Sequence, residues 1–264
     1  VTVTGIDDTD TDGHHLYKVD LYAENVLTNA PEVTSFAGSA GNYGSNDGSG
    51  TEAYFNYPQG IISDGTSIWV TDSGNHKIRR IDISTGEVTT FAGGDYASWN
   101  DGNGTSAYFS YPTGIINDGT SLYVADTNNH RIRRIDISTG DVETLAGSGG
   151  EGSQDGAGTQ ASFNYPRGIT TDGTNLYVAD TNNHKIRKIV ISSGVVSTIA
   201  GGSGGYYGGY QDGNGTDAIF NSPHGITTDG TNLYVADTYN YRIRQIDLST
   251  REVTTIAGDG SYES

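Results

Sequence analysis

Four copies of one phrase, at nearly equal intervals, constrain this chain more than any other feature. Pro58, Pro112, Pro166 and Pro223 each begin the phrase Pro-x-Gly-Ile, and they are 54, 54 and 57 residues apart. Each copy continues with Asp-Gly-Thr, an apolar run such as Leu-Tyr-Val-Ala-Asp, a basic segment ending in Ile-Arg, and an Ala-Gly close. Self-similarity at this period predicts an array of identical supersecondary units, and a propeller is the leading candidate.

Turn residues divide each unit into four strands. In the second copy, residues 114–117 are a short apolar run entered by proline, which has no N–H to give to a ladder. Residues 122–125 are apolar throughout, which indicates burial on both faces. Residues 132–137 and 142–145 follow. Asp118-Gly119-Thr120 separates the first two runs and Ser138-Thr139-Gly140 the last two, and both have turn chemistry. These short connections predict a four-stranded antiparallel blade, so we expect an all-β propeller without helices.

The phrases Pro-x-Gly-Ile, Leu-Tyr-Val-Ala-Asp and Asn-His-Arg-Ile-Arg-Arg-Ile-Asp together resemble the NHL repeat, over roughly residues 55–258. The resemblance implies a β-propeller, usually six-bladed in this family. It also implies a wide range of functions, because the family includes protein-binding and RNA-binding modules and related propellers include lyases and lactonases. The fold alone does not choose among these functions.

Residues 1–38 match the repeat weakly but keep its spacing. Gly5 and Ala37 are 32 residues apart, as are Gly60 and Ala92, and residues 16–22 can serve as a second strand. We therefore expect a single domain over residues 1–264 with five blades, the first of them degenerate. The expected blades are 1–38, 55–93, 109–147, 163–201 and 220–258. The alternative is that residues 1–38 give three strands of an incomplete blade in a larger ring.

The charge balance disfavours the RNA-binding branch of the resemblance. The chain has 14 Lys and Arg against 32 Asp and Glu, a net charge of −18, which repels nucleic acid and anionic membranes. No apolar run is long enough to cross a bilayer. The chain has no cysteine and no methionine and begins at Val1, so we expect a processed protein that is secreted or on the cell surface.

The loops between units repeat the phrase Asp-Gly-x-Gly-Thr, which begins at Asp47, Asp101, Asp155 and Asp212. We expect each aspartate to build an Asx-turn and the glycines to take left-handed angles. Weak metal or sugar binding is the alternative interpretation. The loops are also aromatic, which suits contact with a protein or a carbohydrate. The aromatic residues are Tyr43, Tyr96, Trp99, Tyr206, Tyr207 and Tyr210.

Polar residues that recur in nearly every unit are interpreted as structural, because an active site needs one asymmetric set rather than four copies. We expect the aspartates that end the second strands and the histidines that open the third strands to be hydrogen-bonded corner residues that tie blades together. We also expect the recurring arginines to pair with these aspartates. These residues are Asp72, Asp126, Asp180 and Asp237 with Arg79, Arg133, Arg187 and Arg244; His76, His130 and His184 also recur, with Tyr241 in the last unit.

The propeller axis is where an enzyme site would lie. The residues that the Pro-x-Gly phrases present there are Gln59, Thr113, Arg167 and His224, with Thr4 by the weaker alignment of the first unit. One His and one Arg make neither a three-ligand metal set nor a nucleophile with its base. We therefore expect no catalysis and a binding or structural scaffold. The rival is a lyase or lactonase with an axial metal at His224.

One acidic stretch suggests calcium. Asp8, Asp10 and Asp12, followed by Gly13, match the first half of an EF-hand-type loop, in which alternating carboxylates converge on a hard cation. His14 would add a backbone carbonyl, and Asp20 or water the remainder. The match is incomplete, because the twelfth position is Val19 and not glutamate.

The end of the chain suggests self-assembly. Residues 253–257 are expected to form an outer strand with an exposed edge, and such edges invite pairing with another chain. We therefore expect homomeric contacts, up to a repeating surface polymer.

Overall fold

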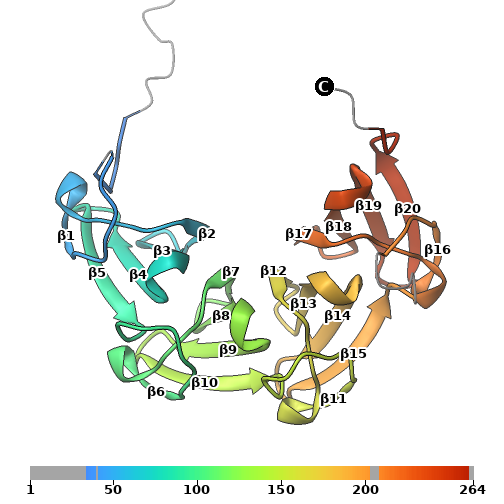
Figure 1. Ribbon diagram of the computed structural model, residues 1–264, viewed down its shortest axis with the longest axis horizontal. Coiled ribbons are helices and arrows are strands. Elements are labelled where there is room, and N and C mark those ends of the chain that lie inside the picture. The colour runs from blue at the N-terminus through green and yellow to red at the C-terminus, as the bar shows by residue number, and fades with distance from the viewer. Residues whose placement is uncertain (1–33, 40, 203–207, 262–264) are drawn as a thin grey trace, which may run out of the picture. The chain divides into compact units, whose positions relative to one another are not determined.

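The computed structural model describes residues 34–39, 41–202 and 208–261. The chain divides into two units, Val1–Ser35 and Phe36–Ser264, and the fold described below belongs to the second unit. Its described residues form four five-stranded antiparallel sheets, one for each well-matched repeat, and each repeat also contains two short 3-10 helices (Figure 1). The predicted all-β propeller architecture is confirmed.

The four sheets have the same strand order, in which a two-residue strand is followed by the fourth, third, second and first long strands. The first sheet consists of β1 (Gly48–Ser49), β2 (Pro58–Ser63), β3 (Ser67–Asp72), β4 (Lys77–Asp82) and β5 (Glu87–Ala92). The second consists of β6 (Gly102–Asn103), β7 (Pro112–Asn117), β8 (Ser121–Asp126), β9 (Arg131–Asp136) and β10 (Asp141–Ala146). The third consists of β11 (Gly156–Ala157), β12 (Pro166–Thr171), β13 (Asn175–Asp180), β14 (Lys185–Val190) and β15 (Val195–Ala200). The fourth consists of β16 (Gly213–Asn214), β17 (Pro223–Thr228), β18 (Asn232–Asp237), β19 (Arg242–Asp247) and β20 (Glu252–Ala257).

Each repeat has two 3-10 helices, one after the short strand and one after the second long strand. They are η1 (Gly50–Glu52), η2 (Ser73–Asn75), η3 (Gly104–Ser106), η4 (Thr127–Asn129), η5 (Gly158–Gln160), η6 (Thr181–Asn183), η7 (Gly215–Asp217) and η8 (Thr238–Asn240).

The Asp-Gly-Thr turns form as the sequence predicts. In the second repeat the Asp118 carboxylate accepts the backbone N–H groups of Thr120 and Ser121 at 2.9 and 2.8 Å. It also accepts the hydroxyl of Tyr123 at 2.7 Å. Gly119 has φ = +90°, which a residue without Cβ adopts at little cost. The turn is thus fixed by its own aspartate and glycine.

The short fifth strand of each sheet was not predicted. The expected loop before the second repeat contains β6, in which Gly102 and Asn103 pair with Val142 and Asp141 of β10. The connector therefore runs to the outer edge of the next sheet before it returns to the innermost strand. Glycine-rich segments with only two paired residues have no strand periodicity, so their sequence resembles a loop. In the fourth sheet this pairing covers part of the outer edge of β20 that we expected to be exposed, at Gly213 and Val253.

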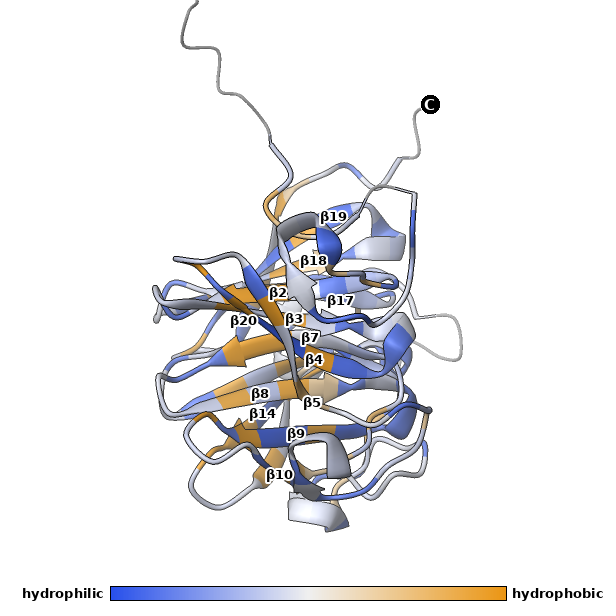
Figure 2. Cartoon of the chain, turned by 90° about the vertical axis from the view of Figure 1, so that its left-hand side faces the viewer, coloured by the Kyte–Doolittle hydropathy of each residue, from blue (hydrophilic) through white to orange (hydrophobic). Residues whose placement is uncertain are grey.

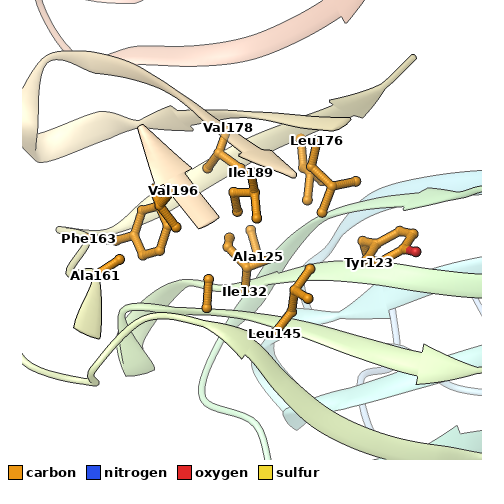
Figure 3. Close-up of a cluster of buried hydrophobic side chains, with 12 residues drawn as sticks. Tyr123, Ala125, Ile132, Leu145, Ala161, Phe163, Leu176, Val178, Ile189 and Val196 are labelled. Carbon is orange, nitrogen blue, oxygen red and sulfur yellow. The ribbon is translucent and has the colours of Figure 1, made fainter. Parts of the chain in front are cut away.

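Successive sheets pack face to face. The innermost strands β2, β7, β12 and β17 contact one another in turn, and buried aliphatic and aromatic side chains fill the space between neighbouring sheets. Figure 3 shows one such cluster between the second and third sheets, where Phe163 and Val178 meet Ala125 and Ile132. Hydrophobic residues are concentrated on the strands (Figure 2). Core formation therefore depends on each sheet having a neighbour.

Ala37 and Gly38, at the end of the weakly matched first repeat, make the same contacts as the residues that end the outer strands of the other repeats. The N–H of Gly38 donates to the carbonyl of Gly50 at 3.0 Å, as Gly93 donates to Gly104 at 3.2 Å. Ala37 packs with Phe55 against the first sheet. Ala37 and Gly38 thus make the contacts that the end of an outer strand makes in the other repeats. The remainder of that predicted blade, residues 1–33, lies outside the described residues, so the count of five blades stays a prediction.

Candidate functional site

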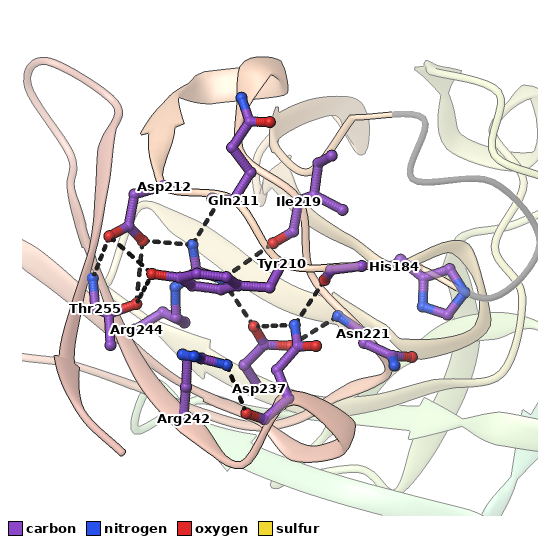
Figure 4. A network of polar contacts seen from close by, with 12 residues as sticks. His184, Tyr210, Gln211, Asp212, Ile219, Asn221, Asp237, Arg242, Arg244 and Thr255 are labelled. Atoms are coloured by element: carbon purple, nitrogen blue, oxygen red, sulfur yellow. Dashed lines mark hydrogen bonds and ion pairs between the residues drawn. The ribbon is translucent and has the colours of Figure 1, made fainter. Parts of the chain in front are cut away.

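The recurring aspartates and arginines form one buried ion pair in each repeat. In the fourth repeat, Arg244 Nη1 lies 2.7 Å from Asp237 Oδ2, and both side chains are fully buried (Figure 4). Asp237 also accepts the N–H of Asn221 and the side-chain amide of Asn240, each at 2.8 Å. In the second and third repeats burial raises the pKa of the equivalent carboxyl groups, while the neighbouring arginine opposes that rise. The predicted pairing of these aspartates with the recurring arginines is confirmed.

The same arginine reaches the connector of its own repeat. Arg244 Nη2 binds Asp212 Oδ1 at 2.7 Å and the carbonyl of Gln211 at 2.8 Å, and Nη1 binds the carbonyl of Ile219 at 3.0 Å. The ion pair therefore attaches each connector to its own sheet, so the expectation that these aspartates tie different blades together is wrong.

The aspartates of the Asp-Gly-x-Gly-Thr phrases do not build the predicted Asx-turns. Asp101 Oδ1 instead accepts Arg133 at 2.8 Å and the hydroxyl of Thr144 at 2.9 Å. Gly104 does take the predicted left-handed conformation, with φ = +54°. Engagement of these carboxylates by arginine leaves them poorly suited to bind a metal. Within residues 34–39, 41–202 and 208–261, no three metal-ligating side chains gather at one place.

The recurring histidines tie neighbouring sheets together, as expected, and the recurring threonines make further contacts between these sheets. His130 Nδ1 accepts the N–H of Tyr165 in the next repeat at 3.1 Å, and the hydroxyl of Thr127 donates to the carbonyl of Pro166 at 2.8 Å. Burial, the larger cause, and the charge of Arg131 together lower the pKa of His130, against the opposing effect of Glu151. A neutral imidazole is the form that can accept the N–H.

The four predicted axial residues occupy equivalent positions on the innermost strands, but their surroundings differ. Gln59 on β2 is exposed, and Thr113 on β7 is buried. The Thr113 hydroxyl lies 2.7 Å from that of Thr127 and 3.2 Å from the carbonyl of Arg167. Arg167 on β12 and His224 on β17 are half-buried. Thr113 thus joins two innermost strands, and only the other three remain available to a ligand.

Arg167 is the unusual member of this set. Within the described part of the chain its guanidinium makes no hydrogen bond or ion pair, and its Nε is buried without a partner. It lies close enough to His224 that its charge, together with the larger effect of burial, lowers the pKa of that imidazole. The Tyr239 ring is 6.3 Å from the His224 ring. An uncompensated cation therefore stands beside a neutral histidine in an otherwise acidic protein.

The aromatic residues of the connecting loops that the structure describes are exposed. Two of their rings stack with an arginine that the sequence analysis did not identify as a contact. Tyr43 and Tyr96 are 82% and 61% exposed. Arg131 stacks 4.0 Å from the Trp99 ring centroid, and Arg242 lies 3.8 Å from that of Tyr210. The sequence did contain a signal for these contacts, because every repeat has a basic residue at this position and the connectors contain aromatic residues. Tyr206 and Tyr207 lie outside the described residues.

The predicted calcium ligands also lie outside the described residues; they are Asp8, Asp10, Asp12, His14 and Asp20. Among the residues that the structure does describe, no helix is long and apolar enough to cross a membrane.

Similarities to known proteins agree with the repeat architecture. The family model of the NHL repeat matches residues 163–189 and 220–246. Protein SUPPRESSOR OF QUENCHING 1, chloroplastic, of Arabidopsis thaliana is 32% identical over 84% of this chain. NHL repeat-containing protein 2 of Homo sapiens is 31% identical over 83% of it. The chain spans only 23% and 35% of the length of these two relatives.

Solved structures show the same fold. The chain is similar to an auxiliary nutrient binding protein from Bacteroides thetaiotaomicron, with 25% identity and a TM-score of 0.58, over 75% of this chain and 48% of that one. The four repeats, their sheets and these relatives together show that this chain belongs to the NHL-repeat β-propeller family.

Proposed function

We propose that this chain is a non-catalytic binding scaffold that takes up a ligand with an anionic group at its innermost strands. The observation that carries the proposal is Arg167, a half-buried residue whose Nε is buried without an acceptor and whose side chain makes no ion pair with a described residue. Removing a charge from water is unfavourable unless a partner compensates for the lost hydration. A carboxylate or a phosphate matches the planar fork of N–H donors that arginine presents.

The internal symmetry of the chain supports this assignment. The ion pairs and turns that form the fold recur in all four repeats. The residue after the first proline of each repeat, at the axial position, is different in each of them. Repetition suits a structural role, and a single asymmetric pair, Arg167 with His224, suits recognition of one ligand. The similarity to a protein named as nutrient-binding points in the same direction.

The rival function, a lyase or lactonase with an axial metal at His224, has weaker support. The positive charge of Arg167 close to His224 opposes a divalent cation there. The equivalent positions on the other described innermost strands carry Gln59 and Thr113, which supply neither an imidazole nor a carboxylate. We therefore propose that the site binds without catalysing a reaction.

A calorimetric titration tests the proposal. The protein is titrated at low salt with acidic oligosaccharides and acidic peptides, and in parallel with neutral molecules of the same length. We expect binding of an acidic ligand, weakened about 10- to 100-fold by Arg167→Gln, because charged hydrogen bonds contribute about 1.5–3 kcal/mol. Arg251→Gln removes an exposed arginine and serves as the matched control.

Two results would contradict this function. Equal binding of the acidic and neutral ligands would show that Arg167 does not recognise an anion. A new product in the ligand mixture, detected by mass spectrometry and lost in His224→Ala, would show that the site is catalytic.

We propose that the exposed aromatic loops add contacts to a protein or carbohydrate ligand. Tyr96→Ser and Trp99→Ser should weaken the binding of such a ligand.

Calcium binding and the extracellular location stay predictions. If Asp8, Asp10 and Asp12 bind calcium, the melting temperature should rise with calcium and fall with EGTA, because the ion offsets the repulsion between neighbouring carboxylates. Asp10→Ala should abolish the difference. An unchanged midpoint would show that the stretch is only an acidic turn.

A further inference from the structure

Tyr239 makes the fourth repeat different from the other three beside the axial position. It is the middle residue of η8, and the equivalent residues of η2, η4 and η6 are Gly74, Asn128 and Asn182. Its side chain is 60% exposed. The fold does not require an aromatic ring there, because the other repeats form the same 3-10 helix with glycine or asparagine. Tyr239 is therefore a candidate for contact with a ligand.

The ring of Tyr239 lies next to His224, the axial residue of the same repeat. Pro223 at the start of β17 pairs with Asp237 at the end of β18, which places the start of β17 beside η8. The centroids of the Tyr239 and His224 rings are 6.3 Å apart, with an angle of 74° between the ring planes. No other axial position holds a histidine. Two side chains that are peculiar to the fourth repeat thus lie together at the axial site.

Arg167 lies beside this pair, on the neighbouring innermost strand. The strands β12 and β17 run so close together that a Cβ at Gly168 would be 2.1 Å from the carbonyl oxygen of His224. The charge of Arg167 also reaches the imidazole, since it lowers the pKa of His224 together with the larger effect of burial. The guanidinium, the imidazole and the Tyr239 ring therefore gather where β12 and β17 begin.

The three side chains offer three kinds of contact. Arg167 makes no ion pair with a described residue, and its guanidinium suits a carboxylate. A neutral imidazole at His224 has one N–H donor and one acceptor nitrogen, which suit a hydroxyl group. The exposed ring of Tyr239 suits the apolar face of another ring. A ligand that uses all three contacts has a carboxylate, hydroxyl groups and a ring.

We propose that the ligand of the axial site is a carboxylated sugar, with its carboxylate at Arg167 and the face of its ring against Tyr239. A hydroxyl group of the sugar forms a hydrogen bond with His224. This inference rests on the proposed function, because it specifies the class of anion that Arg167 takes up.

Two other classes of anion use these contacts less well. An acidic peptide has no sugar ring for Tyr239, and it loses more conformational freedom on binding. A nucleotide has a ring and hydroxyl groups, but its phosphate brings about two negative charges, of which one guanidinium balances one. The net charge of −18 opposes the second charge. A single carboxylate on a sugar ring avoids this repulsion.

An NMR titration of the whole chain at low salt tests the proposal with small ligands. The carboxylated sugars are the methyl glycosides of glucuronic acid and galacturonic acid. The controls are methyl glucoside and methyl galactoside, which lack the carboxylate, N-acetylglutamate amide, which lacks the ring, and adenosine monophosphate. We expect saturable binding of a uronic acid glycoside, with each control at least about tenfold weaker, the effect of losing one charged hydrogen bond.

Variants of Tyr239 separate recognition of the ring from recognition of the charge. Tyr239→Asn introduces the residue that Asn128 and Asn182 provide in their repeats, so the melting temperature should change little. This variant should bind the uronic acid glycoside about threefold to tenfold more weakly. Tyr239→Phe keeps the ring and should bind like the parent chain. Saturation transfer from the protein should be strongest to protons on one face of the sugar ring, and Tyr239→Asn should remove this preference.

Three results would overturn the proposal. If neither uronic acid glycoside binds, or if Tyr239→Asn binds as tightly as the parent, the site does not recognise a sugar ring. If N-acetylglutamate amide binds equally well, the site selects only the charge. Tighter binding of adenosine monophosphate would identify a nucleotide as the ligand.

Arg167→Gln distinguishes failure of this inference from failure of the proposed function. If this variant weakens the binding of any acidic ligand, the axial site still binds anions and only the assignment to a sugar is lost. If it weakens none, both the anion site and the sugar assignment are wrong.

Discussion

The third and fourth sheets have nearly the same sequence, yet their back faces differ in environment. The back face of a sheet is the face on the side of the following repeat. Ile186 on β14 lies under Phe220 and is fully buried, whereas Ile243 on β19 lies at an open recess. Gly168 faces the backbone of the next repeat so closely that a Cβ there would lie 2.1 Å from the carbonyl oxygen of His224. At Gly225, the equivalent residue, the nearest atom would be 3.7 Å away. Burial of the repeat thus depends on its neighbour and not on its own sequence.

The largest expected effect comes from removing the residue that covers the third sheet. Phe220→Ala should lower the free energy of unfolding by about 3–5 kcal/mol, because it leaves a cavity among the buried side chains between the third and fourth sheets. Urea unfolding measures the change. Tyr43→Ala removes an aromatic ring that is 82% exposed and should change stability by less than about 0.5 kcal/mol. Similar values for the two variants would contradict the assigned core.

Truncation of Ile186 and of Ile243 compares the burial of the third and fourth back faces directly. Ile186→Ala should cost about 2–4 kcal/mol, because it leaves a cavity between the third and fourth sheets. Ile243→Ala should cost less than about 1 kcal/mol, because the side chain already meets solvent. Equal losses in thermal or urea unfolding would mean that the face of the fourth sheet is covered in solution.

The glycine pair tests the close approach of the innermost strands. Gly168→Ala should cost about 1–3 kcal/mol, since the new methyl group collides with a backbone carbonyl that cannot move freely. Gly225→Ala meets only ordinary contact distances and should be within about 0.5 kcal/mol of the parent chain. A neutral Gly168→Ala would show that β12 and β17 are not packed this closely.

The smallest expected effect is a pH dependence that arises from the histidines of the covered interfaces. The folded pKa values of His76 and His130 lie below their usual value, mainly because burial disfavours the charged imidazole. The unfolded chain therefore takes up the proton first. Stability is complete above about pH 6.5 and falls as the pH drops through the folded pKa values.

Melting curves between pH 7 and pH 5 test this effect. His130→Gln should flatten the dependence, with a loss below about 1 kcal/mol at pH 7, the scale of one hydrogen bond. Tyr241→Phe in the fourth repeat should leave the pH dependence unchanged. An unaltered slope in His130→Gln would contradict the assigned role of the imidazole in the interface.

Much of the fold could be predicted, because the same turn residues and the same charged residues recur at the same spacing in four repeats. The turn at Asp118-Gly119-Thr120 and the pairing of Asp126 with Arg133 follow from turn chemistry and from the recurrence of both charges. The short strand β6 and the engagement of Asp101 by Arg133 could not be predicted. Both depend on where a glycine-rich connector crosses the next sheet, and no local periodicity records that path.

The candidate site divides in the same way. The sequence identified Gln59, Thr113, Arg167 and His224 as equivalent positions, because each follows a repeated proline. Only the tertiary structure showed that Thr113 is used in joining innermost strands while Arg167 is left without an acceptor in the described chain. Local spacing determines which positions are equivalent, but the partner that each side chain meets depends on the sheet packed beside it.

The sequence by itself determined the repeat, its four long strands, its turns and the family to which the chain belongs. These features follow from residue spacing and from backbone preferences that act within a few residues. The tertiary structure alone decided which copies of the repeat are buried and which face no described residue covers. Ile186 and Ile243 are the same residue in the same local phrase, and they differ because burial is a property of the surfaces that meet, which a local sequence does not encode.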